Sequence, residues 1–326
     1  MIRPFDWRDL PLLHRLRHRG LCLDSQLAYT RGPNVLQFAL LDMLNPGRSA
    51  HTLVFRPGGQ AAIGQVVLPQ GRSGAHIAFL SPAEILEDGH GAEILEAMAR
   101  TGAEHGAHSL IAEVDEHSPA FECLRRFGFA IYSRQRIWGL ASDAIPAAPV
   151  NELQAEDAAA LWRPAAPADE LAISSLYLNL VPGLVQQVEP PPTRHGRDLV
   201  HWRQGELLGY LNFSGGPRGV WVQPYFHPGA EDPDQLLGAF LSHLDDQRQR
   251  PLYVCVRSYQ SWMTAPLRAL GFEALADQAV MVKRLVVSLR QPQPAVLPAL
   301  EGTLPKPTAP FTRIEAEAIP EAKGRP

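Results

Sequence analysis

Two glycines flank a histidine directly before a predicted helix, at Gly89, His90 and Gly91. The first turn of a helix leaves backbone N–H groups without intrahelical partners, and glycines let an anion approach them closely. A Gly-x-Gly at this place can therefore hold a phosphate group. The same residues are also typical of an ordinary helix-initiating turn, in which Asp88 caps the helix.

Other residues that could bind a metal or act as nucleophiles are better explained by structural roles. His14 and His18 are spaced i, i+4 on a predicted helix, but their basic neighbours repel a divalent cation, which favours a solvated helix face. Cys123 and Cys255 fall on a predicted helix and a predicted buried strand, which is typical of core thiols. No Gly-x-Ser-x-Gly, Walker or HExxH pattern occurs, and we expect no metal site.

The elements that position these residues occur twice along the chain. Residues 53–82 and 199–228 both predict three strands separated by glycine-containing turns. A second shared block consists of a predicted helix, an apolar strand, a short helix that closes with LRxxGF, and a final strand. In the two copies this block comprises Glu93–Glu104 and Asp234–Leu244, Ser109–Val114 and Pro251–Val256, Leu124–Phe129 and Leu267–Phe272, and Arg136–Leu140 and Val280–Leu285.

The repeat predicts a division of the chain. We expect a first domain over residues 1–141, a linker over 142–150, a second domain over 151–286 and a tail over 287–326. Eight of the thirty prolines fall in the last thirty-nine residues. Because proline is excluded from helix interiors and central strands, we predict that the tail is mostly disordered.

Composition excludes several classes of function. The chain has 326 residues, of which 45% are hydrophobic and 20% are charged, as in an ordinary globular protein. Its net charge of -4 provides no basic field for nucleic acid. No apolar run approaches the roughly 20 residues that span a bilayer, and Met1–Leu13 lacks the apolar region of a signal peptide. With three cysteines and no disulfide framework, we expect a cytoplasmic protein without membrane or nucleic-acid partners.

The order of elements in each copy resembles the GNAT (GCN5-related N-acetyltransferase) superfamily of acyltransferases, over nearly the whole chain to about residue 285. The segment from Ile2 to Leu16, IRPFDWRDLPLLHRL, looks like the family's opening. Val150–Trp162 looks like the same opening in copy two. The resemblance implies an α/β (α+β) fold of two tandem GNAT-like domains. Each domain is expected to have a mixed, mostly antiparallel sheet flanked by helices.

The resemblance also implies a site for acetyl-CoA in copy one. Family members hold acyl-CoA in a loop of Arg or Gln, two residues, Gly, one residue, and Gly or Ala. The matching cofactor residues here are Phe79, Leu80, Gly89, His90, Gly91 and Ala92. The Arg or Gln position, however, holds Leu86, and Glu87 and Asp88 set two carboxylates beside the expected phosphates. In copy two, residues 229–235 lack Gly-x-Gly and are typical of an acidic helix cap with a proline in the first turn.

The family's second feature is a tyrosine four residues before the glycine of the Gly-Phe pair, where it protonates the leaving thiolate. Leu124 and Leu267 occupy this position here, so the catalytic residues stay unknown. Tyr132, His117 and Tyr259 lie nearby, although each position also suits a structural role.

Two functions follow from these observations. The first is an acyl-CoA-dependent N-acyltransferase that transfers an acetyl group to the amine of a small molecule or protein, with any cofactor site in copy one. The alternative is a catalytically degenerate tandem that acts as a binding or interaction module. The two missing tyrosines and Leu86 favour the alternative, and the surviving Gly89-x-Gly91 favours the first.

Overall fold

The computed structural model describes residues 2–32, 50–56, 61–69, 73–87, 89–145, 161–193, 196–230, 233–241 and 250–285. All of them belong to one compact unit, Met1–Ser288. The predicted tail, residues 287–326, and most of the predicted linker lie outside the described residues. The start of that linker, Ser142–Ala144, forms a single 3₁₀ turn.

The first copy contains the elements that its sequence predicts, with short additions near its start. It opens with β1 (Ile2–Pro4), a 3₁₀ turn (Trp7–Asp9), α1 (Leu10–Leu16), β2 (Leu21–Cys22) and α2 (Ser25–Arg31). The three predicted strands follow as β3 (Ala50–Phe55), β4 (Ala62–Val67) and β5 (Gly74–Ser81). The second block comprises a 3₁₀ turn (Ala83–Leu86), α4 (Gly91–Glu104), β6 (Ser109–Val114), α5 (Pro119–Arg126) and β7 (Ala130–Leu140).

The second copy repeats this order. It opens with β8 (Arg163–Pro164), a 3₁₀ turn (Pro167–Asp169), α7 (Glu170–Leu180) and α8 (Gly183–Gln186). Its three predicted strands are β9 (Leu199–Arg203), β10 (Glu206–Gly215) and β11 (Val220–Phe226). They are followed by α9 (Pro233–Phe240), β12 (Leu252–Arg257), a 3₁₀ segment (Ser258–Met263), α10 (Thr264–Ala269) and β13 (Glu273–Arg284).

An ion pair of the same design stands at the opening of each copy. The Arg3 guanidinium donates two hydrogen bonds to the Asp9 carboxylate, at 2.7 and 2.6 Å. Arg163 donates two to Asp169, at 2.8 and 2.7 Å. Each aspartate also accepts a backbone N–H three residues before it, which fixes the turn ahead of the helix. Arg163–Asp169 thus repeats the arrangement of Arg3–Asp9, whereas most of Val150–Trp162, the opening that the sequence predicts for copy two, lies outside the described residues.

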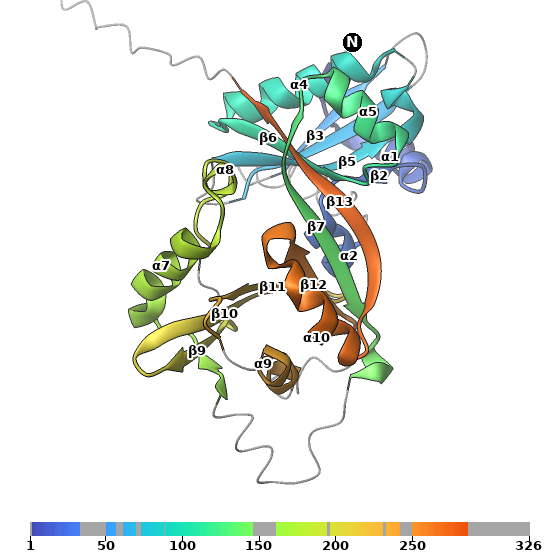
Figure 1. Cartoon of the computed structure of the whole chain (residues 1–326). Coiled ribbons are helices and arrows are strands. Elements are labelled where there is room, and N and C mark those ends of the chain that lie inside the picture. The colour runs from blue at the N-terminus through green and yellow to red at the C-terminus, as the bar shows by residue number, and fades with distance from the viewer. Residues whose placement is uncertain are drawn as a thin grey trace, which may run out of the picture. The chain divides into compact units, whose positions relative to one another are not determined.

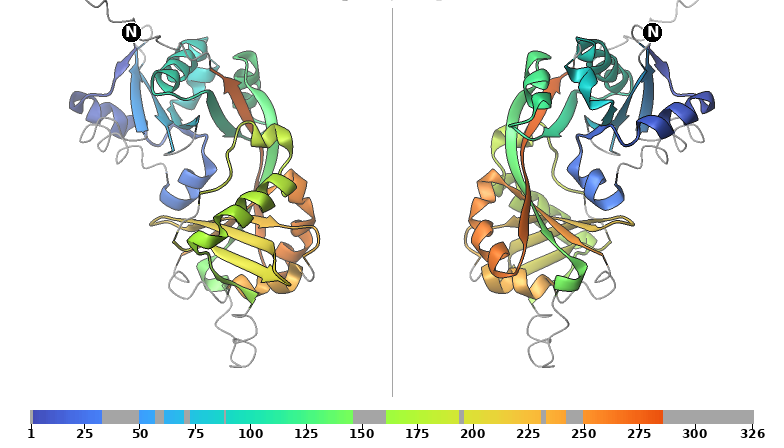
Figure 2. Two further views of the ribbon diagram at one scale, coloured as in Figure 1. Left: turned by 90° about the vertical axis from the view of Figure 1, so that its left-hand side faces the viewer. Right: turned by 90° about the vertical axis from the view of Figure 1, so that its right-hand side faces the viewer.

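The two copies exchange their last strands. The sheet runs in the order β1-β3-β4-β5-β6-β13-β7-β12-β11-β10-β9-β8. Strand β13 of copy two pairs with β6 of copy one, and β7 of copy one pairs with β12 of copy two. The two exchanged strands also pair with each other, antiparallel, from Glu273↔Gly139 to Val282↔Ala130. Figures 1 and 2 show β7 and β13 crossing side by side between the two copies, so that one mixed sheet runs through both.

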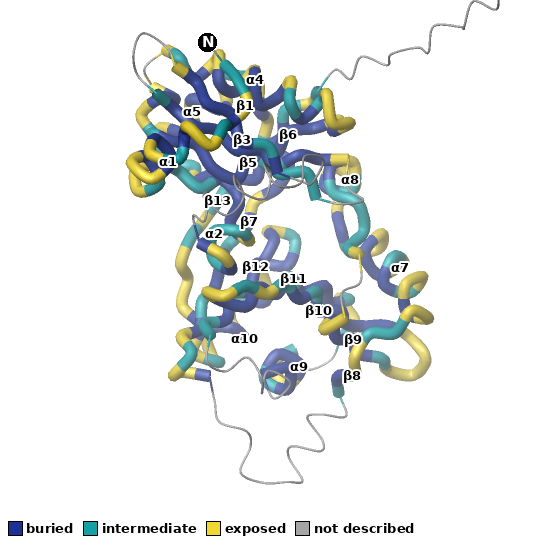
Figure 3. Tube along the Cα trace, turned by 180° about the vertical axis from the view of Figure 1, so that it is seen from behind, coloured by how far each residue is buried: buried dark blue, intermediate teal, exposed yellow. Residues whose placement is uncertain are grey.

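Each copy keeps a hydrophobic core of its own beneath this sheet. In copy one, the buried face of α4, with Ile94, Leu95 and Met98, packs with strand residues such as Phe55. In copy two, Phe240 of α9 packs with Trp138, which belongs to β7 of copy one. Figure 3 shows the buried positions concentrated along the strands and on one side of the helices. The exchanged strands thus contribute to the core of the other copy.

The two Gly-Phe closures have the geometry that their residue type requires. Gly128 and Gly271 follow α5 and α10 with φ of 84° and 86°. This left-handed conformation ends a helix and strains any residue with a Cβ atom. The next residues, Phe129 and Phe272, are buried and begin the return toward the sheet.

Candidate functional site

The predicted acyl-CoA loop lies at the start of α4. Gly89 has a φ of 79° and open space where a side chain would stand. Gly91 is the first residue of α4, and a Cβ there would come within 2.9 Å of the Leu86 Cα. Gly91 is therefore required for close packing of the helix on the preceding turn. The structure brings Gly89, His90, Gly91 and Ala92 together at the helix N-terminus, whereas Asp88 lies outside the described residues.

The cleft in copy one is the space where β5 and β6 stop pairing. They pair as parallel strands only from Gly74↔Ser109 to His76↔Ile111. Beyond that point β2 runs antiparallel to β5, with Leu21 opposite Leu80 and Cys22 opposite Phe79. The backbone edge of Phe79 and Leu80, which the resemblance assigns to the cofactor, is thus paired with the chain itself.

Leu23 completes this insertion by joining the two sides of the cleft. Its N–H donates to the Ala78 carbonyl at 3.2 Å, and its carbonyl accepts the Glu113 N–H at 2.9 Å. The Leu23 side chain is fully buried. Backbone groups that an open cleft would leave for a ligand are therefore satisfied by residues 21–23.

The cleft in copy two is closed by a side chain. Strands β11 and β12 pair only from Val220↔Leu252 to Val222↔Val254. Farther along β11, the Gln260 side chain donates to the Pro224 carbonyl at 2.9 Å and accepts the Phe226 N–H at 3.1 Å. Gln260 is fully buried. One amide thus mimics a neighbouring strand where the two strands separate.

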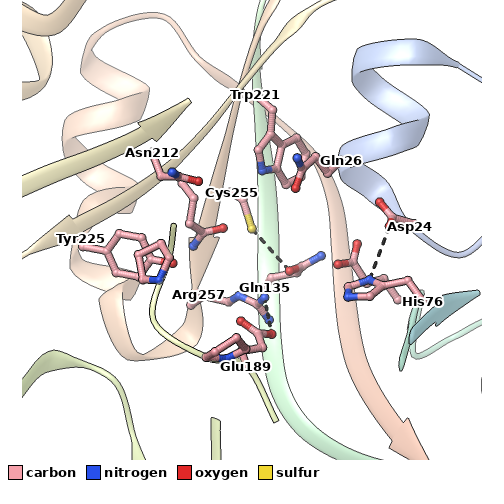
Figure 4. Close-up of a pocket in the computed structure, with 14 residues that line it drawn as sticks. Asp24, Gln26, His76, Gln135, Glu189, Asn212, Trp221, Tyr225, Cys255 and Arg257 are labelled. Atoms are coloured by element: carbon pink, nitrogen blue, oxygen red, sulfur yellow. Dashed lines mark hydrogen bonds and ion pairs between the residues drawn. The ribbon is translucent and has the colours of Figure 1, made fainter. Parts of the chain in front are cut away.

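A polar cavity lies at the junction of the two copies, on the face of the joined sheet shown in Figure 4. Its volume is about 60 Å³, which is room for roughly four to six water-sized groups. Both copies contribute side chains to it. The lining residues are Asp24, Gln26, His76, Glu113, Gln135, Glu189, Pro190, Pro192, Asn212, Trp221, Gln223, Tyr225, Cys255 and Arg257.

Glu113 supplies a buried carboxylate to this cavity. Its Oε2 accepts the Ser25 N–H at 2.8 Å. Burial raises the pKa of the Glu113 carboxyl, and the charge of Asp24 raises it further, while the charge of Arg257 opposes both effects. A carboxyl in such surroundings can accept a proton or bind a cation.

Arg257 supplies a buried cation on the opposite side of the cavity. Its Nη2 donates to Glu189 Oε1 at 2.7 Å, and the same carboxylate oxygen accepts the Tyr132 hydroxyl. Arg257 is 7% exposed. Its Nε and Nη1 have no hydrogen-bond acceptor among the residues that the structure describes.

A chain of amides connects the two sides across the exchanged strands. Ser25 Oγ donates to Gln278 Oε1 at 2.8 Å, and Gln135 Nε2 donates to the same oxygen at 2.9 Å. Cys255 Sγ donates to Gln135 Oε1 at 3.4 Å. These bonds fix the side chain of Gln135 at the floor of the cavity.

The residues considered as alternative acids do not form a reactive group. Burial raises the pKa values of the Tyr132 and Tyr259 hydroxyls above their usual range. His117 is exposed after β6. Burial also raises the pKa of the Cys255 thiol to about 12, so this thiol stays protonated, as expected of a core cysteine.

The sequence interpretation missed Glu113 and Arg257. Each is the one charged residue of a mostly apolar strand and lies near its end, in SLIAEV and in LYVCVR. A charge in a strand that is buried on both faces is a signal of a partner or a site, and it was present in the sequence.

Among the described residues, no group of three or more His, Cys, Asp or Glu side chains could hold a metal ion. Among the same residues, no helix has the length and apolar character needed to cross a membrane.

Comparisons with known proteins identify the fold. No family model and no curated protein matches the sequence. A GCN5-related N-acetyltransferase structure from Sphaerobacter thermophilus is 15% identical, with a TM-score of 0.55 over 87% of this chain and 95% of that one. A tandem GNAT protein from the clavulanic acid biosynthesis pathway is 17% identical, with a TM-score of 0.50 over 87% and 98%.

A third structure, a putative acetyltransferase from Pyrococcus horikoshii, is 10% identical, with a TM-score of 0.51 over 88% of this chain and 90% of that one. All three matches extend through both copies of the repeat, as their coverage requires. The chain therefore has the tandem fold of the GCN5-related N-acetyltransferases.

Proposed function

We propose that this chain is a binding module built on the tandem acyltransferase fold, and that neither strand cleft holds acyl-CoA. The observation that carries the proposal is the closure of both clefts by the chain itself. Leu21–Leu23 fill one as a short strand, and Gln260 fills the other with its side-chain amide. A ligand arm that pairs with the strand edge would have to displace these bonds first.

The helix end of copy one also fits acyl-CoA poorly. Leu86 is buried where the family has Arg or Gln, so it offers no charge to a pyrophosphate. Glu87 is exposed beside the start of α4 and adds a negative charge there. Gly91 has a packing role that explains its presence without a ligand.

The second candidate is the N-acyltransferase, with transfer of an acetyl group to an amine at copy one. Strand β5 retains a bulge that favours it. The pairing with β4 passes from Gln65↔Phe79 to Val66↔Ile77 and so skips Ala78. A bulge re-aims a backbone group at a site, and Glu113 lies next to this cleft as a possible base.

Calorimetric titration of acetyl-CoA into the full chain separates the two candidates. The binding module predicts no heat of binding up to about 1 mM, above most enzyme KM values. The acyltransferase predicts binding that Ala92→Asp abolishes, because Ala92 is exposed in the first turn of α4. Leu171→Asp is the matched control, at the second position of α7 and 86% exposed.

Acetylation of added amines, followed by mass spectrometry, provides the second measurement. Binding that Ala92→Asp weakens and Leu171→Asp leaves intact, together with acetylated product, would replace the binding module with the enzyme. If neither acetyl-CoA binding nor acetylated product is detected, the closed clefts are sufficient to explain the lack of acyltransferase activity.

A further inference from the structure

The junction cavity contains charges of both signs that face one another. Glu113 and Asp24 belong to copy one, and Arg257 belongs to copy two. Strands β6 and β12 are separated by β13 and β7, which is three strand spacings, or about 14 Å between backbones. Arg257 and Glu113 both line the cavity between these strands, so their opposite charges act on the same space.

Arg257 provides the observation that points to a ligand. Its side chain lies on the same face as Cys255, two residues earlier in β12, and Figure 4 shows the guanidinium beside Gln135 and Glu189. Its Nη2 donates to Glu189. A buried guanidinium that leaves Nε and Nη1 without acceptors among the described residues is costly unless another acceptor binds there.

Glu113 provides the opposite end. Its Oε2 accepts the Ser25 N–H at 2.8 Å, and its side chain lines the cavity. Asp24 stands beside it, with Oδ1 on the Leu27 N–H and Oδ2 at 3.4 Å from His76 Nδ1. Two carboxylates at one end of a small cavity favour a positively charged group there.

We propose that the junction cavity binds a small zwitterion of the amino-acid class, with its carboxylate on Arg257 and its ammonium group on Glu113. The volume of about 60 Å³ accommodates roughly four to six heavy atoms, which is the size of glycine or β-alanine. Gln135, held by Gln278, lies between the two ends and contacts the middle of the ligand. Exposed Gln26 stands at the rim and leaves a path for entry.

This inference rests on the proposed binding function and names its ligand. The test is calorimetric titration of the full chain with glycine and with β-alanine, against methylammonium chloride and sodium acetate as ligands that have only one end. We expect at least one zwitterion to bind ten-fold or more tightly than either control. If acetate binds as tightly as the zwitterions, the cavity is an anion site. If methylammonium binds as tightly as the zwitterions, it is a cation site. Either outcome overturns the proposal.

Two variants assign the ends. Arg257→Met and Glu113→Gln are each expected to weaken zwitterion binding ten-fold or more, because a charged hydrogen bond is lost. Arg125→Met and Glu122→Gln are the matched controls, since they remove the same charges from an exposed pair on α5. Weakening by the controls to the same degree would overturn the assignment. Circular dichroism reports whether Arg257→Met remains folded, and Glu113→Gln tests the site independently if it does not.

Trp221 gives a readout that does not depend on affinity. It lines the cavity and is 4% exposed, so filling the cavity changes its fluorescence, and Trp221→Phe removes that change. An unchanged spectrum at saturating ligand would place binding elsewhere and overturn the proposal. The acetyl-CoA titration is independent of these results, because acetyl-CoA binding would refute the closed clefts, whereas absent zwitterion binding would refute only the cavity.

Discussion

The two clefts of this chain differ in how they are closed, although the copies share one order of elements. In copy one a backbone segment, Leu21–Leu23, joins the separated strands, and β5 keeps its bulge at Ala78. In copy two a single side chain, Gln260, bonds the unpaired edge of β11 instead. There β10 and β11 pair without a bulge from Gly209↔Phe226 to Gly215↔Val220. Separating strands leave backbone groups that must find partners, and either a strand or an amide suffices.

The cavity positions differ in the same way. Glu113 in β6 and Cys255 in β12 occupy the same place in the repeat, where SLIAEV aligns with PLYVCV, and both lie beyond the point where the parallel pairing ends. One is a carboxyl and the other is a protonated thiol. The copies have therefore become unequal at the residue that faces the junction, and copy two contributes Arg257 instead.

The largest expected effect concerns the closure of copy two. Gln260→Leu keeps the volume but leaves the Pro224 carbonyl and the Phe226 N–H buried without partners. We expect a loss of about 4 kcal/mol in the free energy of unfolding, measured by urea denaturation. The control is Gln65→Leu, an equally buried glutamine that bonds only the Thr52 side chain and is expected to lose about 1 kcal/mol. Equal losses would mean that Gln260 does not act as a strand substitute.

Leu23→Ala tests the closure of copy one. The backbone bonds of Leu23 persist in this variant, but its fully buried side chain is lost and a cavity remains. We expect a loss of about 3 kcal/mol in the free energy of unfolding. Acetyl-CoA binding is measured on the same variant. A gain of binding would show that copy one, unlike copy two, retains a usable cleft beneath its strand.

The opening ion pairs test where the copies are equivalent. Asp9→Asn and Asp169→Asn should each lower the free energy of unfolding by about 1 kcal/mol at pH 7. The hydrogen bonds from Arg3 and Arg163 lower the pKa of Asp9 and of Asp169. Stability from a carboxyl with a lowered pKa is present above its ordinary value and is lost as pH falls below it. The difference from wild type should therefore shrink below about pH 4, and losses that differ between the two variants would contradict this equivalence.

The smallest effect is a change in pH dependence. Because burial raises the pKa of Glu113, the folded state holds its proton to higher pH than the unfolded state does. The free energy of unfolding of the wild type should thus decline as pH rises above the ordinary glutamate pKa of about 4.3. Glu113→Gln removes this contribution, and its urea midpoint should exceed that of the wild type increasingly with pH. A constant difference across pH 4 to about 7 would show that folding does not shift the pKa of Glu113.

Local structure was predictable from the sequence because it depends on neighbouring residues. The glycine-punctuated strands, the Gly-Phe closures and the start of α4 follow from turn chemistry and periodicity. The repeated ion pair was visible in the sequence as well, since Arg3-Pro4 and Arg163-Pro164 each precede an aspartate at the same spacing. The predicted opening at Val150–Trp162 lies mostly outside the described residues and stays a prediction. The domain boundaries remain a prediction.

The closures and the exchange depend on partners far away in sequence. Alternation shows that β7 and β13 are strands, but it does not show which strand each pairs with, because either neighbour satisfies the same backbone groups. In the same way, nothing local to Leu21–Leu23 or Gln260 indicates that a cleft lies opposite. The charged residues Glu113 and Arg257 were visible in the sequence, whereas their meeting at one cavity required the exchanged strands.

The exchange of β7 and β13 also determines how the molecule unfolds. Each copy would lose an interior strand if the other melted, and its core would lose residues such as Trp138 at the same moment. Thermal unfolding should therefore proceed as a single cooperative transition across both copies rather than as two independent ones. In a fragment that contains one copy alone, the strand edge that normally pairs with the exchanged strand would be unpaired. We expect such a fragment to associate with a second fragment through this edge.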